Sequence, residues 1–288
     1  MARLDQSRNS LTVGQRVFER YYLKRTLGQG GMGVVWLAHD RVLEQPIALK
    51  FLAPHLLEDR YELERLKAET RRSLKLSHPN IVRIHDFIQT QHGAAVAMEY
   101  VDGWSLWTLK VDKPHQLFTA DEIAPWIRDL CAALHYAHTE AGIVHRDVKP
   151  ANLIINSRGQ LKITDFGLSH DLRRSAGPVA ANGRVVGTDW YMSPQQWTGD
   201  PASVADDVYS LGATLYELLT GKPPFFEGDI FKQLHENVPP TMTERLFEFG
   251  VTDTVIPLAW EETVAACLEK EPARRPVSIR DVAARLGL

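Results

Sequence analysis

Four polar side chains near the middle of the chain have the types and spacing of a reaction centre. Asp147, Lys149 and Asn152 lie within the segment His-Arg-Asp-Val-Lys-Pro-Ala-Asn, and Asp165 follows in the sequence Asp-Phe-Gly. A carboxylate can accept the proton of a hydroxyl, and an ammonium can bind a phosphate. Carboxylate and amide oxygens are the ligands that Mg²⁺ prefers. These are the groups that phosphoryl transfer requires.

A second candidate site is rich in glycine and lies near the N-terminus. Gly28, Gly30 and Gly33 have the spacing G-x-G-x-x-G, which also occurs where glycines open a helix in dinucleotide-binding folds. Here the residues that follow, Val-Val-Trp-Leu-Ala, predict a strand instead. We therefore expect a hairpin whose backbone N–H groups face phosphates. A purely structural hairpin is the alternative, although it would rarely need so many glycines.

A lysine and a glutamate are expected to pair near this hairpin. Lys50 ends an apolar strand one strand and a turn after Gly33. Leu63, Leu66 and Glu69 recur at a spacing of three, which places the Glu69 carboxylate on the apolar face of a helix. A carboxylate facing inward is costly without a cation, and Lys50 would supply one. Ordinary surface charges are the alternative for both residues.

The chain divides into a strand-rich part and a helix-rich part. Strands are predicted at 21–27, 33–39, 46–52, 81–88 and 94–100, with a charged helix at 58–76. A capping box at Thr119 predicts a helix from there, and a hairpin at 153–163 and an apolar helix at 209–220 follow. Residues 1–10 read as a loose polar tail, and residues 171–187 as a mobile loop.

The composition excludes several classes of protein. Hydrophobic residues make up 44% and charged residues 24% of the 288 positions, and the net charge is −3. This balance argues against a protein that neutralises nucleic acid or coats an anionic membrane. The stretch 1–11 is too polar for a signal peptide. Cys131 and Cys267 are predicted to be buried free thiols, which favours a cytoplasmic location.

Together, the glycine-rich segment, the HRDVKPAN segment and the DFG segment resemble the catalytic domain of eukaryotic-type Ser/Thr protein kinases, with some similarity to bacterial members. The lysine two residues after Asp147 resembles Ser/Thr kinases rather than tyrosine kinases. The resemblance extends from about Phe18 to Leu286. It implies an α+β, bilobal fold with a small five-stranded antiparallel β lobe carrying one main helix and a larger, mainly helical lobe. The implied boundaries are a tail at 1–17, an N-terminal lobe at 18–98 and a C-terminal lobe at 99–288.

The resemblance also implies a role for each candidate residue. Asp147 would be the base, Lys149 would stabilise the transferring phosphoryl group, and Thr188 would contact both. Asn152 and Asp165 would hold Mg²⁺, which Mn²⁺ could replace. The positions that would bind ATP are Leu27, Gly28, Gly30, Gly33, Val35, Ala48, Lys50, Glu69, Met98, Glu99, Val101 and Leu153. The implied activity is transfer of the ATP γ-phosphate to Ser or Thr of proteins, the enzyme itself included, and a homodimer would allow such autophosphorylation.

Two further positions follow from the resemblance. Asp207 would brace the backbone of the HRD segment. Arg275 matches an arginine that pairs with a glutamate in the family, but the partner position here is Gln195. A neutral hydrogen bond is weaker than a charge-assisted one, so we expect the substrate-binding segment to be less firmly anchored.

The segment between Asp165 and Gly187 contains no threonine, and only Ser169 and Ser175 carry hydroxyls there. Arg146, directly before Asp147, usually implies a phosphate on this segment to neutralise it. Ser175, beside two arginines, is the better candidate. A kinase that needs no phosphate on this segment is the alternative.

Two other functions are compatible with the same residues. A pseudokinase would use the fold as a nucleotide-binding scaffold, but the lysine, the base and the DFG aspartate are all present. A small-molecule kinase is the second alternative. Lys149, Thr188 and the long segment 168–200 favour a protein substrate.

Overall fold

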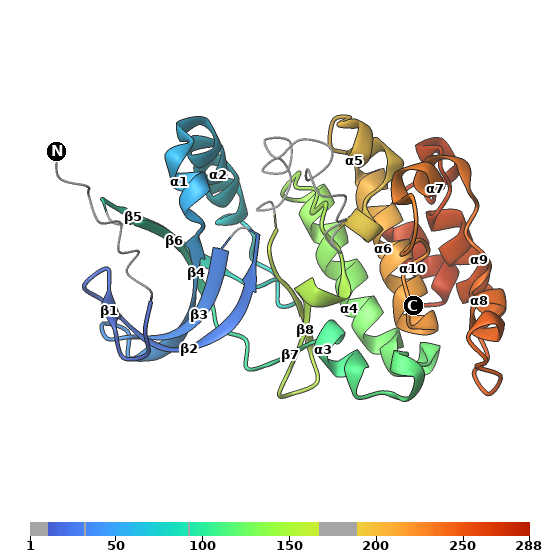
Figure 1. The fold of residues 1–288 in the computed structure, drawn as a ribbon, viewed down its shortest axis with the longest axis horizontal. Coiled ribbons are helices and arrows are strands. Elements are labelled where there is room, and N and C mark those ends of the chain that lie inside the picture. Colours follow the sequence, from blue (N-terminus) through green and yellow to red (C-terminus); the bar gives the residue numbers. More distant parts are fainter. Residues whose placement is uncertain (1–10, 32, 92, 167–188) are drawn as a thin grey trace. The chain divides into compact units, whose positions relative to one another are not determined.

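The computed structural model describes residues 11–31, 33–91, 93–166 and 189–288. Its chain forms two compact units, shown in Figure 1: a sheet unit (Met1–Lys67 and Ile84–Tyr100) and a helical unit (Ala68–Arg83 and Val101–Leu288). The predicted tail at 1–10 and the predicted loop at 171–187 lie outside the described residues. The lobe boundaries proposed from the sequence stay predictions.

The sheet unit is built on an antiparallel sheet with the strand order β1-β2-β3-β4-β6-β5. Its strands are β1 (Arg16–Val17), β2 (Tyr21–Gly30), β3 (Gly33–Asp40), β4 (Gln45–Leu52), β5 (Ile84–Thr90) and β6 (Gly93–Glu99). Six strands therefore replace the five that were predicted. The additional strand, β1, has only two residues, which is too short to show an alternating pattern.

The helix predicted at 58–76 is α2 (Arg60–Ser73), and a short helix that was not predicted, α1 (Pro54–Glu58), precedes it. Asp59 between them has an extended backbone, and its carboxylate accepts hydrogen bonds from the N–H groups of Tyr61 (2.9 Å) and Glu62 (3.2 Å). An aspartate in this role satisfies N–H groups that the first turn of a helix cannot. The helix therefore begins two residues later and ends three residues earlier than predicted.

The two faces of the sheet carry different residues. Trp36 lies opposite Leu49, and Leu49 lies opposite Ala97. These three residues belong to a buried apolar cluster. Because side chains alternate along a strand, the other face carries the pair of Val35 and Lys50 and the pair of Ala48 and Met98. Four residues predicted to bind ATP thus share the face opposite this core.

The helical unit contains eight helices of five or more residues within its described part, in addition to the end of α2. They are α3 (Leu106–Val111), α4 (Ala120–Thr139), α5 (Pro194–Thr198), α6 (Val204–Thr220), α7 (Ile230–Glu236), α8 (Met242–Glu248), α9 (Leu258–Cys267) and α10 (Ile279–Leu286). A small sheet joins β7 (Gly103–Ser105), β8 (Leu153–Asn156) and β9 (Leu161–Ile163). Short 3₁₀ turns lie at η1 (Pro114–Gln116), η2 (Pro150–Asn152), η4 (Asp189–Tyr191) and η5 (Pro272–Arg274).

Two helix starts show how well the sequence marks such positions. The predicted capping box at Thr119 is present, with Glu122 completing it. The helix predicted at 209–220 instead begins at Val204, because Ser203 and Asp206 form a capping box at its start. The aspartates in the first turn of α6 made this part of the helix look polar, although both are buried.

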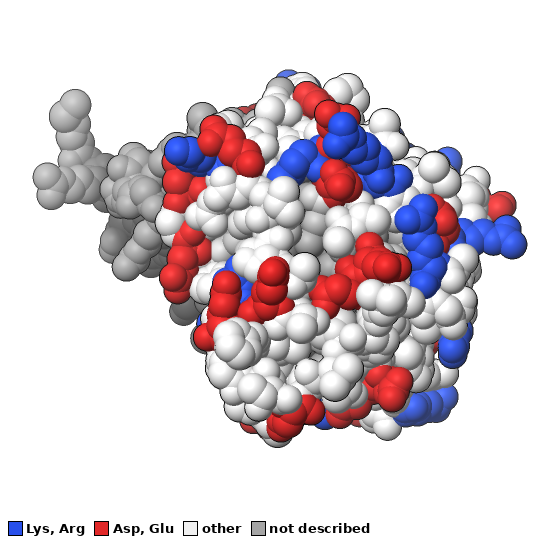
Figure 2. Space-filling model, turned by 90° about the vertical axis from the view of Figure 1, so that its right-hand side faces the viewer, with Lys and Arg blue, Asp and Glu red and all other residues white. Residues whose placement is uncertain are grey.

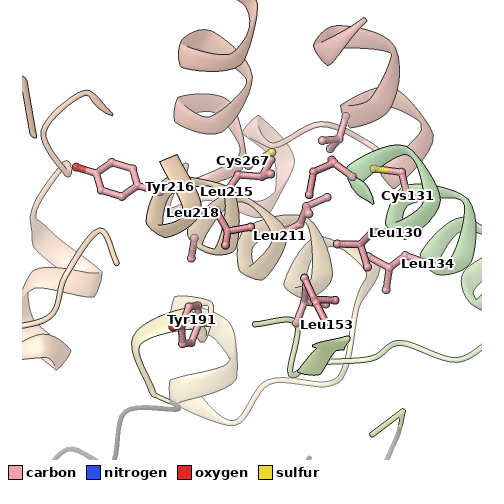
Figure 3. Close-up of a cluster of buried hydrophobic side chains, with 14 of the residues drawn as sticks. Leu130, Cys131, Leu134, Leu153, Tyr191, Leu211, Leu215, Tyr216, Leu218 and Cys267 are labelled. Carbon is pink, nitrogen blue, oxygen red and sulfur yellow. The ribbon is translucent and has the colours of Figure 1, made fainter. Parts of the chain in front are cut away.

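Helix α6 forms the centre of the core of the helical unit, and every residue from Asp206 to Thr220 is buried. Figure 3 shows Leu211 of α6 directed toward Leu130 and Leu134 of α4, and Cys267 of α9 beside α6. Gly212 permits this close packing, because a Cβ there would lie 2.5 Å from the Cβ of Cys267.

Both cysteines are free and buried, as predicted. Burial raises the pKa of the Cys131 thiol to about 12 and also raises the pKa of Cys267. Neither thiol therefore has the thiolate character that makes a cysteine reactive. None of the described helices combines the length and the apolar character needed to cross a bilayer.

Gly33 is required by the fold of the sheet unit. Its φ is +138°, and a Cβ would lie 1.8 Å from the carbonyl oxygen of Phe51. We predict that Gly33→Ala lowers the free energy of unfolding by more than about 1 kcal/mol, because the backbone must shift. Urea unfolding measures the change. Gly30→Ala is the matched control, since a Cβ at Gly30 meets no atom within 4 Å. Equal stability of the two variants would contradict the prediction.

Candidate active site

Three of the predicted site residues come together between α4 and β8. The Nζ of Lys149 donates to both carboxylate oxygens of Asp147, at 2.9 and 2.8 Å. The amide nitrogen of Asn152, in the turn η2, donates to the Asp147 carboxylate (2.9 Å) and to the Asp147 carbonyl (2.8 Å). The carboxylate is thus oriented by a cation and an amide, and all three side chains lie in one unit.

Two hydrogen bonds made by the backbone of Thr164 bring the neighbouring Asp165 to the same place. The N–H of Thr164 donates to the carbonyl of Asn152 (3.0 Å). The Nδ1 of His145 accepts from the N–H of Asp147 (3.1 Å), so its Nε2 must carry the proton and donate to the carbonyl of Thr164 (2.9 Å). The imidazole therefore links Asp147 to the residue before Asp165. The ring also meets Phe166 edge-on, with 4.4 Å between centroids.

The donor set at this place fits a hard divalent cation. Because the amide nitrogen of Asn152 is used by Asp147, its amide oxygen is directed away from that carboxylate. Together with the carboxylate of Asp165 it offers two oxygen ligands. Mg²⁺ commonly takes only one or two protein ligands and completes its shell with phosphates and water. Within the described ranges no group of three or more His, Cys, Asp or Glu gathers to hold a metal, so no competing site of that kind lies there.

The backbone around the base is held by α6. The carboxylate of Asp207 accepts from the N–H groups of His145 (2.8 Å) and Arg146 (2.6 Å), which is the bracing expected from the sequence. His138 of α4 also contacts this carboxylate through Nε2, at 2.6 Å. Burial acts to raise the pKa of Asp207, but the contacts with His138 and the His145 N–H outweigh it, and the pKa is lowered.

His138 was missed by the sequence analysis, and so was Thr214, whose hydroxyl donates to the carbonyl of Val148 (3.1 Å). A third omission is a buried cluster of Lys110, Glu217 and Tyr191. Lys110 and the Tyr191 hydroxyl both donate to the Glu217 carboxylate. Burial, together with the charge of Glu217, raises the pKa of Tyr191. A mid-helix glutamate among leucines was the only signal that could have found this cluster.

The remaining predicted residues are placed separately in the two units. In the sheet unit, Lys50, Ala48 and Met98 are buried, while Leu27 is exposed and Val35 and Glu99 are half-buried. A Cβ at Gly28 or Gly30 would meet no atom within 4 Å. In the helical unit, Leu153 is buried, and Val101 and Glu69 are half-buried.

The pairing of Lys50 with Glu69 stays a prediction, because the two residues belong to different units. Thr188, Ser169 and Ser175 lie outside the described residues. Their expected roles therefore also stay predictions.

The hydrogen bond expected between Gln195 and Arg275 is present. Nη2 of Arg275 donates to the amide oxygen of Gln195 (2.7 Å), and the amide nitrogen of Gln195 donates to the carbonyl of Lys270 (3.0 Å). The guanidinium also donates to the carbonyls of Glu269 and Ala205. Neutral acceptors thus surround a buried cation, and the start of α5 is held without an ion pair.

Lys270 lies beside this network in an unfavourable place for a charge. Its Nζ is buried without a hydrogen-bond acceptor in the described part of the chain, and lies 4.6 Å from the centroid of the Phe225 ring. Burial and, to a smaller degree, the charge of Arg275 lower the pKa of Lys270 to about 8. The folded protein therefore binds fewer protons than the unfolded chain between about pH 8 and the ordinary lysine pKa near 10.5.

This proton balance gives a pH-dependent prediction. Below pH 8 the protonated Lys270 costs stability, and this cost disappears as the pH rises toward 10.5. We predict that Lys270→Met raises the free energy of unfolding at pH 7 and that the gain shrinks between pH 8 and 10. Urea titrations at several pH values measure the difference. Lys222→Met, at an exposed lysine near Phe226, is the matched control. A gain that grows with pH would overturn the assignment.

Comparison with known proteins agrees with this geometry. Residues 21–284 match the family described as protein kinase domain. A probable serine/threonine-protein kinase of Corynebacterium efficiens is 35% identical over 280 residues, covering 94% of this chain and 41% of the relative. Serine/threonine-protein kinase PknB of Mycobacterium tuberculosis is 39% identical over 220 residues, covering 75% of this chain and 34% of the relative. The chain thus spans about two fifths of the length of such relatives or less.

The crystal structure of the PknI kinase domain of Mycobacterium tuberculosis, as a double mutant, matches with a TM-score of 0.77 and 25% identity, covering 96% of this chain and 98% of that one. The bilobal fold expected from the sequence is therefore confirmed. Family membership also implies the use of ATP and a divalent metal ion. The chain belongs to the protein kinase family, and its relatives place it among the bacterial Ser/Thr protein kinases.

Proposed function

We propose that this domain transfers the γ-phosphate of Mg-ATP to Ser and Thr hydroxyls of proteins, with Asp147 as the base. The observation that carries the proposal is the arrangement of Asp147, Lys149 and Asn152. One carboxylate is held by an ammonium and an amide, and its backbone is fixed from α6. Fixed charges around the reacting atoms are the main source of rate in phosphoryl transfer.

Each polar group of the helical unit has one task in this scheme. Asp147 accepts the proton of the substrate hydroxyl as the oxygen attacks phosphorus. Lys149, already within 2.9 Å of the carboxylate, stabilises negative charge on the transferring group. Asn152 and Asp165 would hold Mg²⁺, with Mn²⁺ as an alternative. The metal, when bound, neutralises phosphate oxygens.

The sheet unit would bind the nucleotide. The face with Val35, Ala48, Lys50 and Met98 offers apolar contacts for a ring and one ammonium for phosphates. The open space around Gly28 and Gly30 would let phosphates approach the backbone N–H groups. Leu27, Gly33, Glu99, Val101 and Leu153 complete the proposed ATP site, and Glu69 would pair with Lys50.

The substrate is proposed to be a protein, with Thr188 contacting Asp147 and Lys149. Tyr191, in the turn η4 that follows the residues not described, is bound to α6 through Glu217, which would anchor the segment that meets a peptide. Figure 2 shows acidic and basic side chains interspersed on the visible face, without a broad basic surface that would suit nucleic acid. A homodimer would allow autophosphorylation. The free buried thiols support a cytoplasmic setting.

The test of this proposal compares the protein with Asp147→Asn. We predict that phosphate transfer from Mg-ATP to a generic basic protein falls by about 10²–10⁴-fold, because the general base is lost. Mass spectrometry identifies the modified residues, and addition of a chelator should abolish transfer by the unaltered protein. Asp253→Asn, at an exposed bend, is the matched control and should retain full activity.

Nucleotide binding separates the alternatives. If the unaltered protein binds nucleotide but transfers no phosphate, the result would favour a pseudokinase that acts as a nucleotide-binding scaffold. Transfer to a small molecule but not to a protein would favour a small-molecule kinase. Transfer that persists in Asp147→Asn would remove Asp147 as the base.

A further inference from the structure

Arg146, directly before the proposed base, lies against a carboxylate of its own unit. Its side chain is 4% exposed, and its Nε lies 3.5 Å from Oδ2 of Asp206, which is 1% exposed. Nη2 also donates to the carbonyl of Asp200 (3.4 Å). A buried guanidinium is costly without an anion. Asp206 is therefore in place as a counter-ion, through a charge contact at 3.5 Å rather than a hydrogen bond from Nε.

The carboxylate of Asp206 is itself held on three sides. It accepts from the hydroxyl of Ser193 (2.7 Å) and from the N–H of Ser203 (3.0 Å). It also lies in the first turn of α6, where the helix dipole favours a negative charge. Because these contacts come from residues of the chain itself, the anion is a part of the fold.

The contacts close into a ring that joins three segments. Ser193, at the start of α5, binds Asp206 and accepts from the N–H of Gln196 (3.1 Å). Gln196 in turn donates from its amide nitrogen to the carbonyl of Arg146 (2.9 Å). The segment around the base, the start of α6 and the start of α5 are thus connected through Arg146 and Asp206.

The neighbouring aspartate completes this hold on the segment. Asp207 binds the N–H of Arg146, while Asp206 faces its guanidinium. Arg146 has a φ of +64°, a left-handed conformation that a non-glycine residue keeps only when its surroundings impose it. Two successive carboxylates therefore fix both the backbone and the side chain next to Asp147.

We propose that Asp206 is the resident counter-ion of Arg146 and acts as a positioning residue for Asp147. Phosphate transfer would then need no phosphate on Ser169 or Ser175, the only hydroxyl residues between Asp165 and Gly187. The inference rests on the proposed function and adds how that site is regulated. An arginine beside the base would otherwise need an anion from a modified segment.

The first experiment asks whether a phosphate is required. The protein is treated with phosphatase, checked by mass spectrometry, and compared with Ser169→Ala/Ser175→Ala. We expect kcat of both to stay within about threefold of the untreated protein, because the anion is built in. Activity that appears only after phosphorylation of Ser169 or Ser175 would overturn the inference and leave the proposed function intact. Inactivity in both forms would instead overturn the proposed function, and the inference with it.

The second experiment tests whether Asp206 acts through Arg146. Asp206→Asn, Arg146→Gln and the double variant are compared in the Ser169→Ala/Ser175→Ala background. We expect Asp206→Asn to lower kcat about tenfold or more with little change in KM for ATP, because it removes the carboxylate that faces a buried cation. The double variant, which removes the cation as well, should be at least as active as Asp206→Asn. Losses that multiply would mean that the two residues act independently, and would overturn the inference.

A matched control separates the counter-ion role from helix capping. Asp281 occupies the same place in α10 that Asp206 occupies in α6, three residues after a serine at the helix start. Asp281→Asn should leave kcat unchanged. If Asp281→Asn and Asp206→Asn lowered kcat to the same degree, capping alone would explain the loss, and the inference would fail.

Discussion

The structure of the site depends on the burial of two adjacent carboxylates at the start of α6. Asp206 and Asp207 are 1% and 0% exposed, and such groups are tolerated only when charged or hydrogen-bonding partners surround them. Those partners are the side chain and the N–H groups of the segment that carries Asp147, with His138 and Ser193. Because the buried carboxylates need these partners, their hydrogen bonds stabilise the conformation of the segment that carries Asp147.

Helix α6 can hold the carboxylates in place because it is packed on all sides. Its residues from Asp206 to Thr220 are buried without interruption, and Gly212 allows α9 to approach closely. A helix that is buried on all sides opens less readily than one that faces water. Side chains of α6 hold neighbouring segments in place, because Thr214 donates to the carbonyl of Val148 and Glu217 accepts from the hydroxyl of Tyr191.

Much of this could be predicted from the sequence because local patterns carry it. The glycine spacing, the strands and the HRD and DFG segments identified the fold, and the capping box at Thr119 marked a helix start correctly. The pairs that hold the site together could not be predicted in the same way. His138 and Asp207 are far apart in sequence, and nothing local to either residue indicates the other.

Where local patterns misled, the cause was polar residues at buried positions. Asp206 and Asp207 made the first turn of α6 look exposed. Sequence periodicity assigns charged residues to the surface, so it fails where tertiary contacts bury them. These are also positions on which the site depends.

The left-handed residues around the site bear on how this protein would respond to heat. Arg146 and Asp165 have φ values of +64° and +65°, and each such residue costs about 1–3 kcal/mol unless neighbours compensate. When the surrounding contacts weaken, we expect the backbone of these residues to return to a more common conformation. The reactive geometry would then be lost through local opening, at a temperature below that at which the helices melt. We therefore expect thermal inactivation of this domain to precede its global unfolding.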